Sequence, residues 1–198
     1  MLYTRKGDNG TTKTFGCDQR ISKGGDVAEA LGALDEVNSF LGLVKVKSLE
    51  LDKIDKTSSS KSLTILNVNF VEIVAGIQQN LFIIQAEVAG SKMSISEEKI
   101  IECEGYIDEA EKILPPIKTF FVSGGTEVAV LCDISRTLAR KAERRVVAVK
   151  DGHGGINGDF NISEGSLAYL NRLSSLLYAM ARLSNFYGGI VEDAPSYK

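Results

Sequence analysis

Apolar residues recur every three or four positions along five stretches of the chain, and this spacing predicts amphipathic helices. The predicted helices cover residues 26–47, 63–88, about 95–114, 127–149 and 166–187. A capping box of Ser94 and Glu97 opens the third helix, which ends before Pro115. Gly90 is the predicted cap of the second helix. Long helices with short connections predict an all-α, up-and-down, five-helix bundle, with the ferritin-like class as the general architecture.

The segments between the predicted helices lack this periodicity. Residues 56–62 are a polar linker, and residues 150–165 are a glycine-rich loop. Thr119–Val122 is the only weak candidate for a strand. We expect a single domain over residues 1–198, made of an extended arm, a bundle and a tail (1–25, 26–187 and 188–198).

Composition narrows the class of protein. The 198 residues are 43% hydrophobic and 25% charged, with 26 acidic against 23 basic side chains. A chain of this size buries roughly 70% of its unfolded surface, so it needs no disulfide or metal to hold its core. Its apolar content excludes a disordered chain, and a net charge of -3 argues against a general nucleic-acid binder.

The three cysteines, Cys17, Cys103 and Cys132, stand far apart in no CxxC or CxxH spacing. This pattern indicates neither a zinc site nor a disulfide framework, and small buried thiols in a reducing compartment are the expected interpretation. The N-terminal residues hold no apolar secretory segment, and no apolar run is long enough to span a membrane. We expect a soluble, cytoplasmic protein with no membrane partner.

The single histidine, His153, restricts the chemistry of any interior site. A di-iron carboxylate site in a bundle needs Glu-x-x-His on two helices, so the chain cannot be a ferritin-like oxidase. Histidine-based nucleophilic catalysis is also disfavoured. The sequence around Asp151 fails an Asp-x-His-x-x-Gly motif, because Ile156 stands at its last position. We interpret His153 as an exposed loop residue.

Cations, hydroxyls and glycines are concentrated in residues 4–14 of the arm. Glycine lets backbone N–H groups approach an anion, hydroxyls donate hydrogen bonds and lysine neutralises charge, which is what a polyphosphate requires. The segment is not a Walker A motif. A flexible polar N-terminus is the open alternative.

The fourth predicted helix carries Arg136, Arg140 and Glu143 within about 60° of one another. The apolar residues expected on the opposite side are Leu131, Ile134, Leu138, Ala142, Val146 and Val149. One interpretation is a solvated face with pairs such as Arg140–Glu143. The other is an arginine clamp on phosphates, with the glutamate orienting a guanidinium or holding a metal through water.

Two further polar pairs lie in apolar helices. Asp35-Glu36 is either an exposed acidic pair or part of a site, and Asn171-Arg172 either binds a ligand or faces solvent.

Six segments then occur in an order that resembles a known family. They are TRKGDNGTT (4–12), ALGALDEVNSFLG (30–42), IQQNLFIIQAEVA (77–89), LPPIKTFFVSGGT (114–126), SRTLARKAERRVV (135–147) and YLNRLSSLLYAMAR (169–182). Together they closely resemble the PduO-type, or MMAB-like, ATP:cob(I)alamin adenosyltransferases over nearly the whole chain.

The resemblance implies a homotrimer of five-helix bundles with active sites between subunits. Such enzymes transfer the 5′-deoxyadenosyl group of ATP to the cobalt of cob(I)alamin and release triphosphate. Mg²⁺ would accompany ATP, cobalamin would be the second substrate, and a cob(II)alamin reductase and a B12-dependent enzyme are implied partners. A non-catalytic, ATP-responsive cobalamin-delivery module on the same bundle is the alternative.

The resemblance also assigns roles to residues. Arg136, Arg140, Asp35 and Phe120 would be catalytic: Arg136 would pair with Asp35 of a neighbouring subunit, and Phe120 would exclude cobalamin's lower axial base. The implied ATP-binding residues are Thr4, Arg5, Lys6, Gly7, Thr12, Lys13, Lys23, Arg140, Lys141, Glu143, Arg144 and Asn171. The metal would be held mainly by the ATP phosphates, with Glu143 as its one candidate protein ligand.

Some positions depart from the family pattern. Lys141 stands where arginine is common, Ser175 where aspartate is common and Ser123 where proline is common. Lysine keeps the charge but loses the bidentate fork of arginine. The C-terminal Phe186, Tyr187 and Tyr197 either close over the corrinoid or belong to a frayed terminus.

Overall fold

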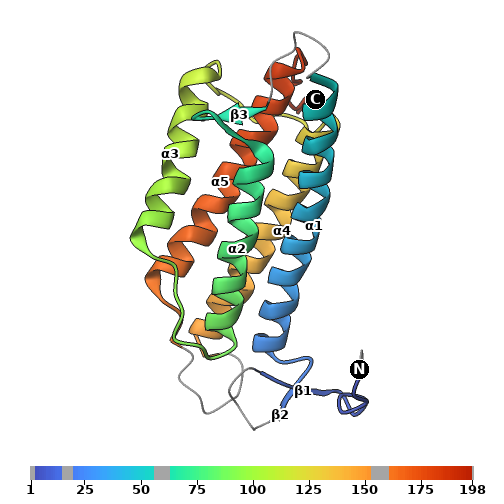
Figure 1. Cartoon of the computed structure of the whole chain (residues 1–198), viewed down its shortest axis with the longest axis vertical. Helices are drawn as coiled ribbons and strands as arrows, with labels where there is room; N and C mark the ends of the chain where they lie inside the picture. Colours follow the sequence, from blue (N-terminus) through green and yellow to red (C-terminus); the bar gives the residue numbers. More distant parts are fainter. Residues whose placement is uncertain (1–2, 15–19, 56–62, 153–160, 198) are drawn as a thin grey trace.

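The computed structural model describes residues 3–14, 20–55, 63–152 and 161–197, with the backbone alone for 51–55. Within these residues it contains five helices, which run up and down as one bundle (Figure 1). Their bounds are α1 Asp26–Asp55, α2 Phe70–Val88, α3 Glu97–Ile113, α4 Glu127–Lys150 and α5 Glu164–Tyr187. The predicted all-α helical bundle is therefore confirmed.

Helix α4 lies at the centre of the packing, in contact with α1 on one side and α5 on the other. Helix α2 packs on α1, and α3 packs on α5. The core is formed by fully buried side chains such as Leu34, Leu81 and Leu173. By contrast, only Cys103 and Ala110 of α3 are buried. Helix α3 is therefore the most exposed wall of the bundle, and it contacts α5 rather than α4.

Three helices begin with a side-chain cap. The side chains of Asn69, Thr126 and Ser163 accept hydrogen bonds from the first turns of α2, α4 and α5. Gly90 directly follows Ala89, the C-cap residue of α2. Its φ of 100° is a left-handed conformation that glycine adopts without strain.

The predicted capping box of Ser94 and Glu97 is wrong. Helix α3 begins at Glu97, and the residue before it, Ser96, caps the helix without a side-chain hydrogen bond. Ile95 is buried, and its N–H lies 3.4 Å from the Ser166 hydroxyl of α5. This anchor holds the chain outside the helix for two residues longer than the motif predicts.

The periodic segment predicted as one helix over 63–88 begins as a hairpin. Strands β3 (Thr64–Ile65) and β4 (Val68–Asn69) pair antiparallel, and α2 starts only after them. Leu66 and Asn67 form the turn, with φ values of 54° and 63°. The prediction that Thr119–Val122 is the strand candidate is wrong, because that segment is irregular.

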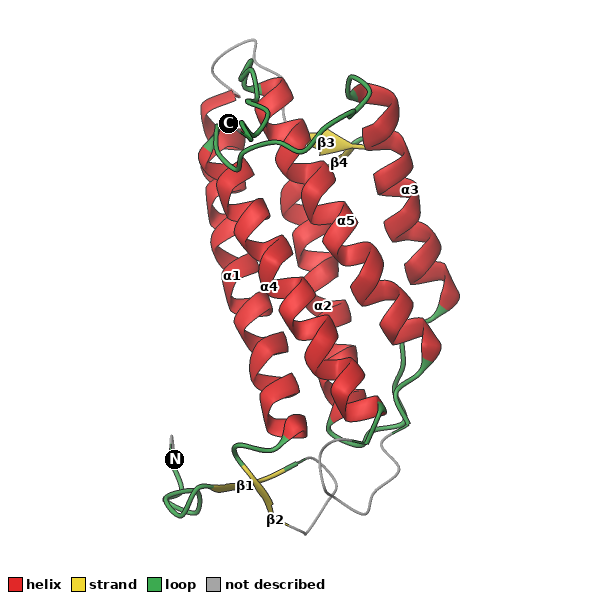
Figure 2. Ribbon diagram, turned by 180° about the vertical axis from the view of Figure 1, so that it is seen from behind, coloured by secondary structure: helices red, strands yellow, loops and turns green. Residues whose placement is uncertain are grey.

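The arm also contains a hairpin rather than only an extended chain. Strand β1 (Thr11–Lys13) pairs antiparallel with β2 (Arg20–Ser22). The hairpin lies at the end of the bundle where α1 begins, and α1 itself runs eight residues beyond the predicted end at 47 (Figure 2). Lys47 extends the helix by pairing with Glu50 at 3.2 Å, one turn further on.

Cys103 and Cys132 are buried free thiols, as predicted. Burial raises the pKa of Cys103 to about 12 and also raises the pKa of Cys132. Cys17 and His153 lie outside the described residues, so their predicted environments stay predictions. In the described part of the chain, no helix is long and apolar enough to cross a membrane.

Candidate functional site

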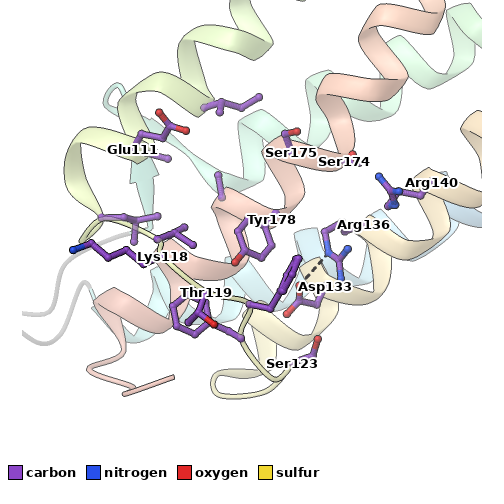
Figure 3. Close-up of a pocket in the computed structure, with 17 residues that line it drawn as sticks. Glu111, Lys118, Thr119, Ser123, Asp133, Arg136, Arg140, Ser174, Ser175 and Tyr178 are labelled. Atoms are coloured by element: carbon purple, nitrogen blue, oxygen red, sulfur yellow. Dashed lines mark hydrogen bonds and ion pairs between the residues drawn. The ribbon is translucent and has the colours of Figure 1, made fainter. Parts of the chain in front are cut away.

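A cavity of about 820 Å³ opens between α3, the segment 114–126, α4 and α5 (Figure 3). Its walls combine two chemistries. The α3 side and the connecting segment supply apolar side chains, among them Ile107, Leu114 and Phe120. The α4 side supplies the guanidinium groups of Arg136 and Arg140. Such a space suits a large, mostly apolar ligand that also carries or approaches negative charge.

Three of the predicted catalytic residues therefore meet at one cavity. Phe120 is 78% exposed, because Pro115 and Pro116 end α3 and leave the following segment outside the core. Arg136 Nε lies 3.3 Å from Asp133 Oδ1, an ion pair drawn in Figure 3. Arg140 lies one helical turn further along α4.

Arg140 and Arg144 are exposed on α4 and have no hydrogen bond or ion pair to another described residue. The Arg140–Glu143 pair named in the solvated-face alternative is not formed, because Glu143 instead accepts a hydrogen bond from Asn171 Nδ2 at 3.1 Å. The phosphate-clamp role of this face stays a prediction. Ile134, predicted on the buried face, is 38% exposed. The α4 surface thus presents two guanidinium groups free to bind an anion.

Lys141 differs from its neighbour Arg140. Its Nζ lies 2.7 Å from Glu36 Oε2 of α1, so its charge is compensated within the protomer. Asp35 is exposed on α1 and makes no ion pair with another described residue. Within one protomer the structure does not bring Asp35 to Arg136; that predicted contact between subunits stays a prediction.

Asn171 is oriented from two sides. Its Nδ2 donates to Glu143, and its Oδ1 accepts a hydrogen bond from Arg172 at 3.1 Å. Arg172 Nε in turn donates to Glu104 of α3 at 3.0 Å. These contacts tie α3, α5 and α4 together. The described residues contain no cluster of three metal-ligating side chains, so Glu143 by itself is not a complete metal site.

The arm is folded around Arg20, which the sequence analysis did not single out. Arg20 Nε donates to Thr11 Oγ1 at 2.6 Å, and its terminal nitrogen donates to the carbonyl groups of Thr11 and Lys6. Lys23 packs against Gly7, where an added Cβ would lie 3.0 Å from its Nζ. Only the hairpin register places Arg20 here, and no sequence motif indicates it.

The arm and the segment 114–126 lie at opposite ends of the bundle in one protomer. The hairpin of the arm is at the end where α1 begins, whereas the segment 114–126 crosses the opposite end, before α4 (Figures 1 and 2). The predicted ATP-binding residues of the arm (Thr4, Arg5, Lys6, Gly7, Thr12, Lys13 and Lys23) are thus not gathered with Phe120 in one chain. The second half of α4 lies closer to the arm, because Lys141 and Arg145 pair with Glu36 and Glu29 near the start of α1.

No pattern in the sequence pointed to Arg182, which is only 2% exposed. Its terminal nitrogens reach Asp133 Oδ2 at 2.6 Å and Glu192 Oε1 at 2.7 Å. Its guanidinium also lies 4.9 Å from the ring centre of Tyr178, a cavity residue whose pKa is raised by burial. The one signal in the sequence was an arginine among apolar neighbours.

The interpretation of the C-terminus as frayed is wrong for its first part. The N–H of Val122 donates to the carbonyl of Asp193 at 2.9 Å, and Glu192 pairs with Arg182. Phe186 is 45% exposed and Tyr197 86% exposed, and their closure over a corrinoid stays a prediction.

Comparison with known proteins agrees with this geometry. The sequence model for cobalamin adenosyltransferase matches residues 2–184. The corrinoid adenosyltransferase PduO of Salmonella typhimurium is 35% identical over 188 residues, which are 91% of this chain and 48% of that protein. The chain thus spans about half the length of that relative. The corrinoid adenosyltransferase of Bacillus subtilis is 34% identical over 193 residues, 96% of this chain and 89% of the relative.

Solved structures show the same fold. A variant of the PduO-type ATP:corrinoid adenosyltransferase from Lactobacillus reuteri, complexed with cobalamin and ATP, superposes with a TM-score of 0.80 at 26% identity. The match covers 98% of this chain and 99% of that one. With a family model that spans nearly its whole length and a full-length relative of the same class, the chain belongs to the cobalamin adenosyltransferase family.

Proposed function

We propose that the protein transfers the 5′-deoxyadenosyl group of ATP to the cobalt of cob(I)alamin and releases triphosphate. Family membership supports the activity. The observation that carries it for this chain is the cavity of about 820 Å³ in which Arg136, Arg140 and Phe120 meet. A corrinoid is large and mostly apolar, and a departing triphosphate needs cations beside it, so both requirements are met in one place.

The reaction asks little acid–base chemistry of the protein. The nucleophile is the reduced cobalt of the substrate, so the chain need not supply one. The cobalt electron pair forms the Co–C bond as the C5′–O bond breaks, and the charge passes to the triphosphate. Arg140 and Arg144 carry no compensating ion pair among the described residues, so they are available to stabilise that charge as it develops.

We place the complete site between subunits of a homotrimer. In the protomer the arm lies at the end of the bundle where α1 begins, whereas the segment 114–126, which carries Phe120, crosses the other end, so we infer that a second chain completes the site. Asp35 has no ion pair with a described residue and is available to a neighbour's Arg136. Exposed apolar side chains about two and three turns further along α1, Leu43 and Val46, would be covered by such an interface.

Phe120 would deny space to the lower axial base of cobalamin. Its ring is held at the cavity on an exposed segment rather than packed in the core. A Co(II) ion without that donor is easier to reduce, because no axial lone pair raises the energy of the acceptor orbital. The ring would therefore favour the formation of the Co(I) nucleophile without any proton transfer.

Mg²⁺ fits the site only as a companion of ATP. Glu143 is a single half-buried carboxylate, held by Asn171, and the described residues provide no ligand cluster around it. The phosphates would thus supply most of the ligands, with Glu143 as a single protein contact. When bound, the ion neutralises part of the charge on the triphosphate. A cob(II)alamin reductase, a B12-dependent enzyme and a cytoplasmic location are further proposals from the family.

The test is an anaerobic assay with MgATP and chemically reduced cobalamin, in which the cob(I)alamin absorption is followed. We expect its conversion to the spectrum of adenosylcobalamin. Tight ATP binding without conversion would favour a delivery module of the same fold over the enzyme. The departures at Lys141, Ser123 and Ser175 leave Arg136 and Arg140 in place at the cavity, and this favours the enzyme.

A further inference from the structure

Arg182 lies behind the wall of the cavity rather than in it. Its guanidinium is almost completely buried and contacts two carboxylates from different parts of the chain, Asp133 of α4 and Glu192 of the C-terminal segment. Its Nε has no hydrogen-bond partner among the described residues. Asp133 is shared with a second cation, Arg136, so the removal of Glu192 leaves two guanidinium groups with one carboxylate, and Arg182 is the buried one.

Asp133 links Arg182 to the cavity. One carboxylate oxygen, Oδ2, accepts from Arg182 at 2.6 Å, and the other, Oδ1, accepts from Arg136 Nε at 3.3 Å. The ring of Tyr178 lies against both guanidinium groups, with centre distances of 4.9 Å to Arg182 and 6.0 Å to Arg136. The orientation of Arg136 therefore depends on a carboxylate that Arg182 holds.

The same arginine is connected to the segment that carries Phe120. The guanidinium of Arg182 lies 5.8 Å from the ring centre of Phe121. Beyond it, Glu192 accepts from Asn185 Nδ2 at 2.6 Å, and the next residue of the C-terminal segment accepts from the N–H of Val122 at 2.9 Å. The C-terminal segment and α5 thus hold the segment that carries Phe120 on the side that faces Arg182.

A second cavity, of about 180 Å³, lies beside the segment that carries Phe120 and Phe121. It is lined by Arg182 and Glu192, and it shares Leu114, Ile117 and Phe121 with the main cavity. Phe121, with Leu114 and Ile117, therefore lies between the two spaces, and the Arg182 guanidinium lies near its ring. On loss of the buried ion pair we expect this ring to shift toward the smaller cavity and to displace the neighbouring Phe120.

We propose that Arg182 is a positioning residue for the proposed adenosyl transfer: with Asp133 and Glu192 it sets the orientation of Arg136 and the place of the Phe120 segment. The inference rests on the proposed function. Four residues form an ion-paired row in the order Glu192, Arg182, Asp133 and Arg136. The inference gives this row a role in corrinoid binding in addition to its effect on protein stability.

The first test replaces Glu192 by glutamine, which keeps an oxygen for Asn185 but removes the charge that faces Arg182. Glu109→Gln is the matched control, because Glu109 pairs with Lys112 on the surface of α3 and lies outside the cavity lining. For Glu192→Gln we expect the KM for cobalamin to rise at least about fivefold, while the KM for ATP stays within about twofold. The control should behave as the wild type.

The electronic state of the substrate supplies a readout that a stability defect would not imitate. With cob(II)alamin and MgATP bound, the electron paramagnetic resonance spectrum distinguishes four-coordinate from five-coordinate Co(II). We expect a smaller four-coordinate fraction in Glu192→Gln than in wild type, measured well below the melting temperature of both. An unchanged fraction together with an unchanged KM for cobalamin overturns the inference.

The second test asks whether the row acts as one unit. The losses in kcat/KM for cobalamin caused by Asp133→Asn and by Glu192→Gln should not multiply, because each substitution already disturbs Arg182. The double variant should therefore lose less than the product of the two single losses. Multiplicative losses in kcat/KM for cobalamin overturn the shared role. Failure of the wild type to convert cob(I)alamin would instead reject the proposed function, so the two failures are distinguishable.

Discussion

At the residue scale, neighbouring cations on α4 differ in what they are free to do. Lys141 is paired with Glu36 at 2.7 Å, whereas Arg140, the residue before it, has no partner among the described residues. A cation without an internal partner keeps its full charge for a ligand. We therefore place the main electrostatic role on Arg140 rather than on Lys141.

Arg140→Ala should lower kcat/KM for ATP by about 10²- to 10³-fold, the usual loss when one donor to a developing negative charge is removed. Its free energy of unfolding should change by less than about 0.5 kcal/mol, because the side chain is exposed and unpaired. Steady-state kinetics and urea unfolding measure the two effects. Arg145→Ala, which removes a surface contact of 3.7 Å to Glu29, is the control, and equal kinetics in both variants would contradict the role of Arg140.

Two buried thiols make the stability depend on alkaline pH. Burial raises the pKa of Cys103 to about 12 and raises the pKa of Cys132, whereas an unfolded thiol titrates near pH 8.5. Above that pH the unfolded chain has lost protons that the folded chain keeps, so the free energy of unfolding falls. The contribution is complete below about pH 8.5 and is lost progressively toward pH 12.

We expect a slope of about 1.4 kcal/mol per pH unit for each such thiol once the pH exceeds 8.5. Urea unfolding of wild type and of Cys103→Ala between pH 7 and 10 measures it, and the variant should show the shallower slope. Parallel slopes in the two proteins would mean that Cys103 does not stay protonated in the fold.

At the scale of elements, periodicity predicted the helices well and the hairpins badly. Five apolar stripes are sufficient to predict five helices, because each stripe fits only a period near 3.6 residues. Residues 63–69 kept the apolar spacing of the helix that follows, so their hairpin was hidden. The start of α3 was missed because the anchor between Ile95 and Ser166 joins residues distant in sequence.

For the candidate site as well, the sequence predicted the residues that share one helix but not the contacts between helices. Arg136 and Arg140 were found because they share one helical face. The contact of Arg182 with Asp133 was not predicted, because it joins two helices at positions 49 residues apart in the sequence. Spacing within an element predicts a shared face, but it does not predict which faces meet.

The β3–β4 turn offers a test of local strain. Leu66 adopts a φ of 54° at the first central position of the hairpin, where asparagine and glycine are favoured. Its side chain is 50% exposed, so little packing is lost on replacement. Leu66→Asn should raise the free energy of unfolding by about 0.5–1 kcal/mol. A lower urea midpoint than wild type would show that the packing of the Leu66 side chain outweighs the strain.

At the scale of the whole molecule, the placement of the arm and of the segment that carries Phe120 at opposite ends of the bundle predicts cooperation between chains. Lys6→Ala and Arg140→Ala should each be nearly inactive alone. Mixed oligomers of the two should recover about a quarter of wild-type activity, because some sites then combine an intact arm with an intact cavity. Co-refolding of differently tagged chains measures the recovery. Mixed oligomers no more active than their parents would place the whole site within one chain.

The proposed chemistry itself is tested most directly by its product balance. Under anaerobic conditions with MgATP and cob(I)alamin, triphosphate and adenosylcobalamin are quantified in the same samples over the course of the reaction. We expect one triphosphate for each Co–C bond formed, because the cobalt attacks C5′ and the whole chain of phosphates leaves together. Release of orthophosphate or diphosphate without adenosylcobalamin would contradict adenosyl transfer.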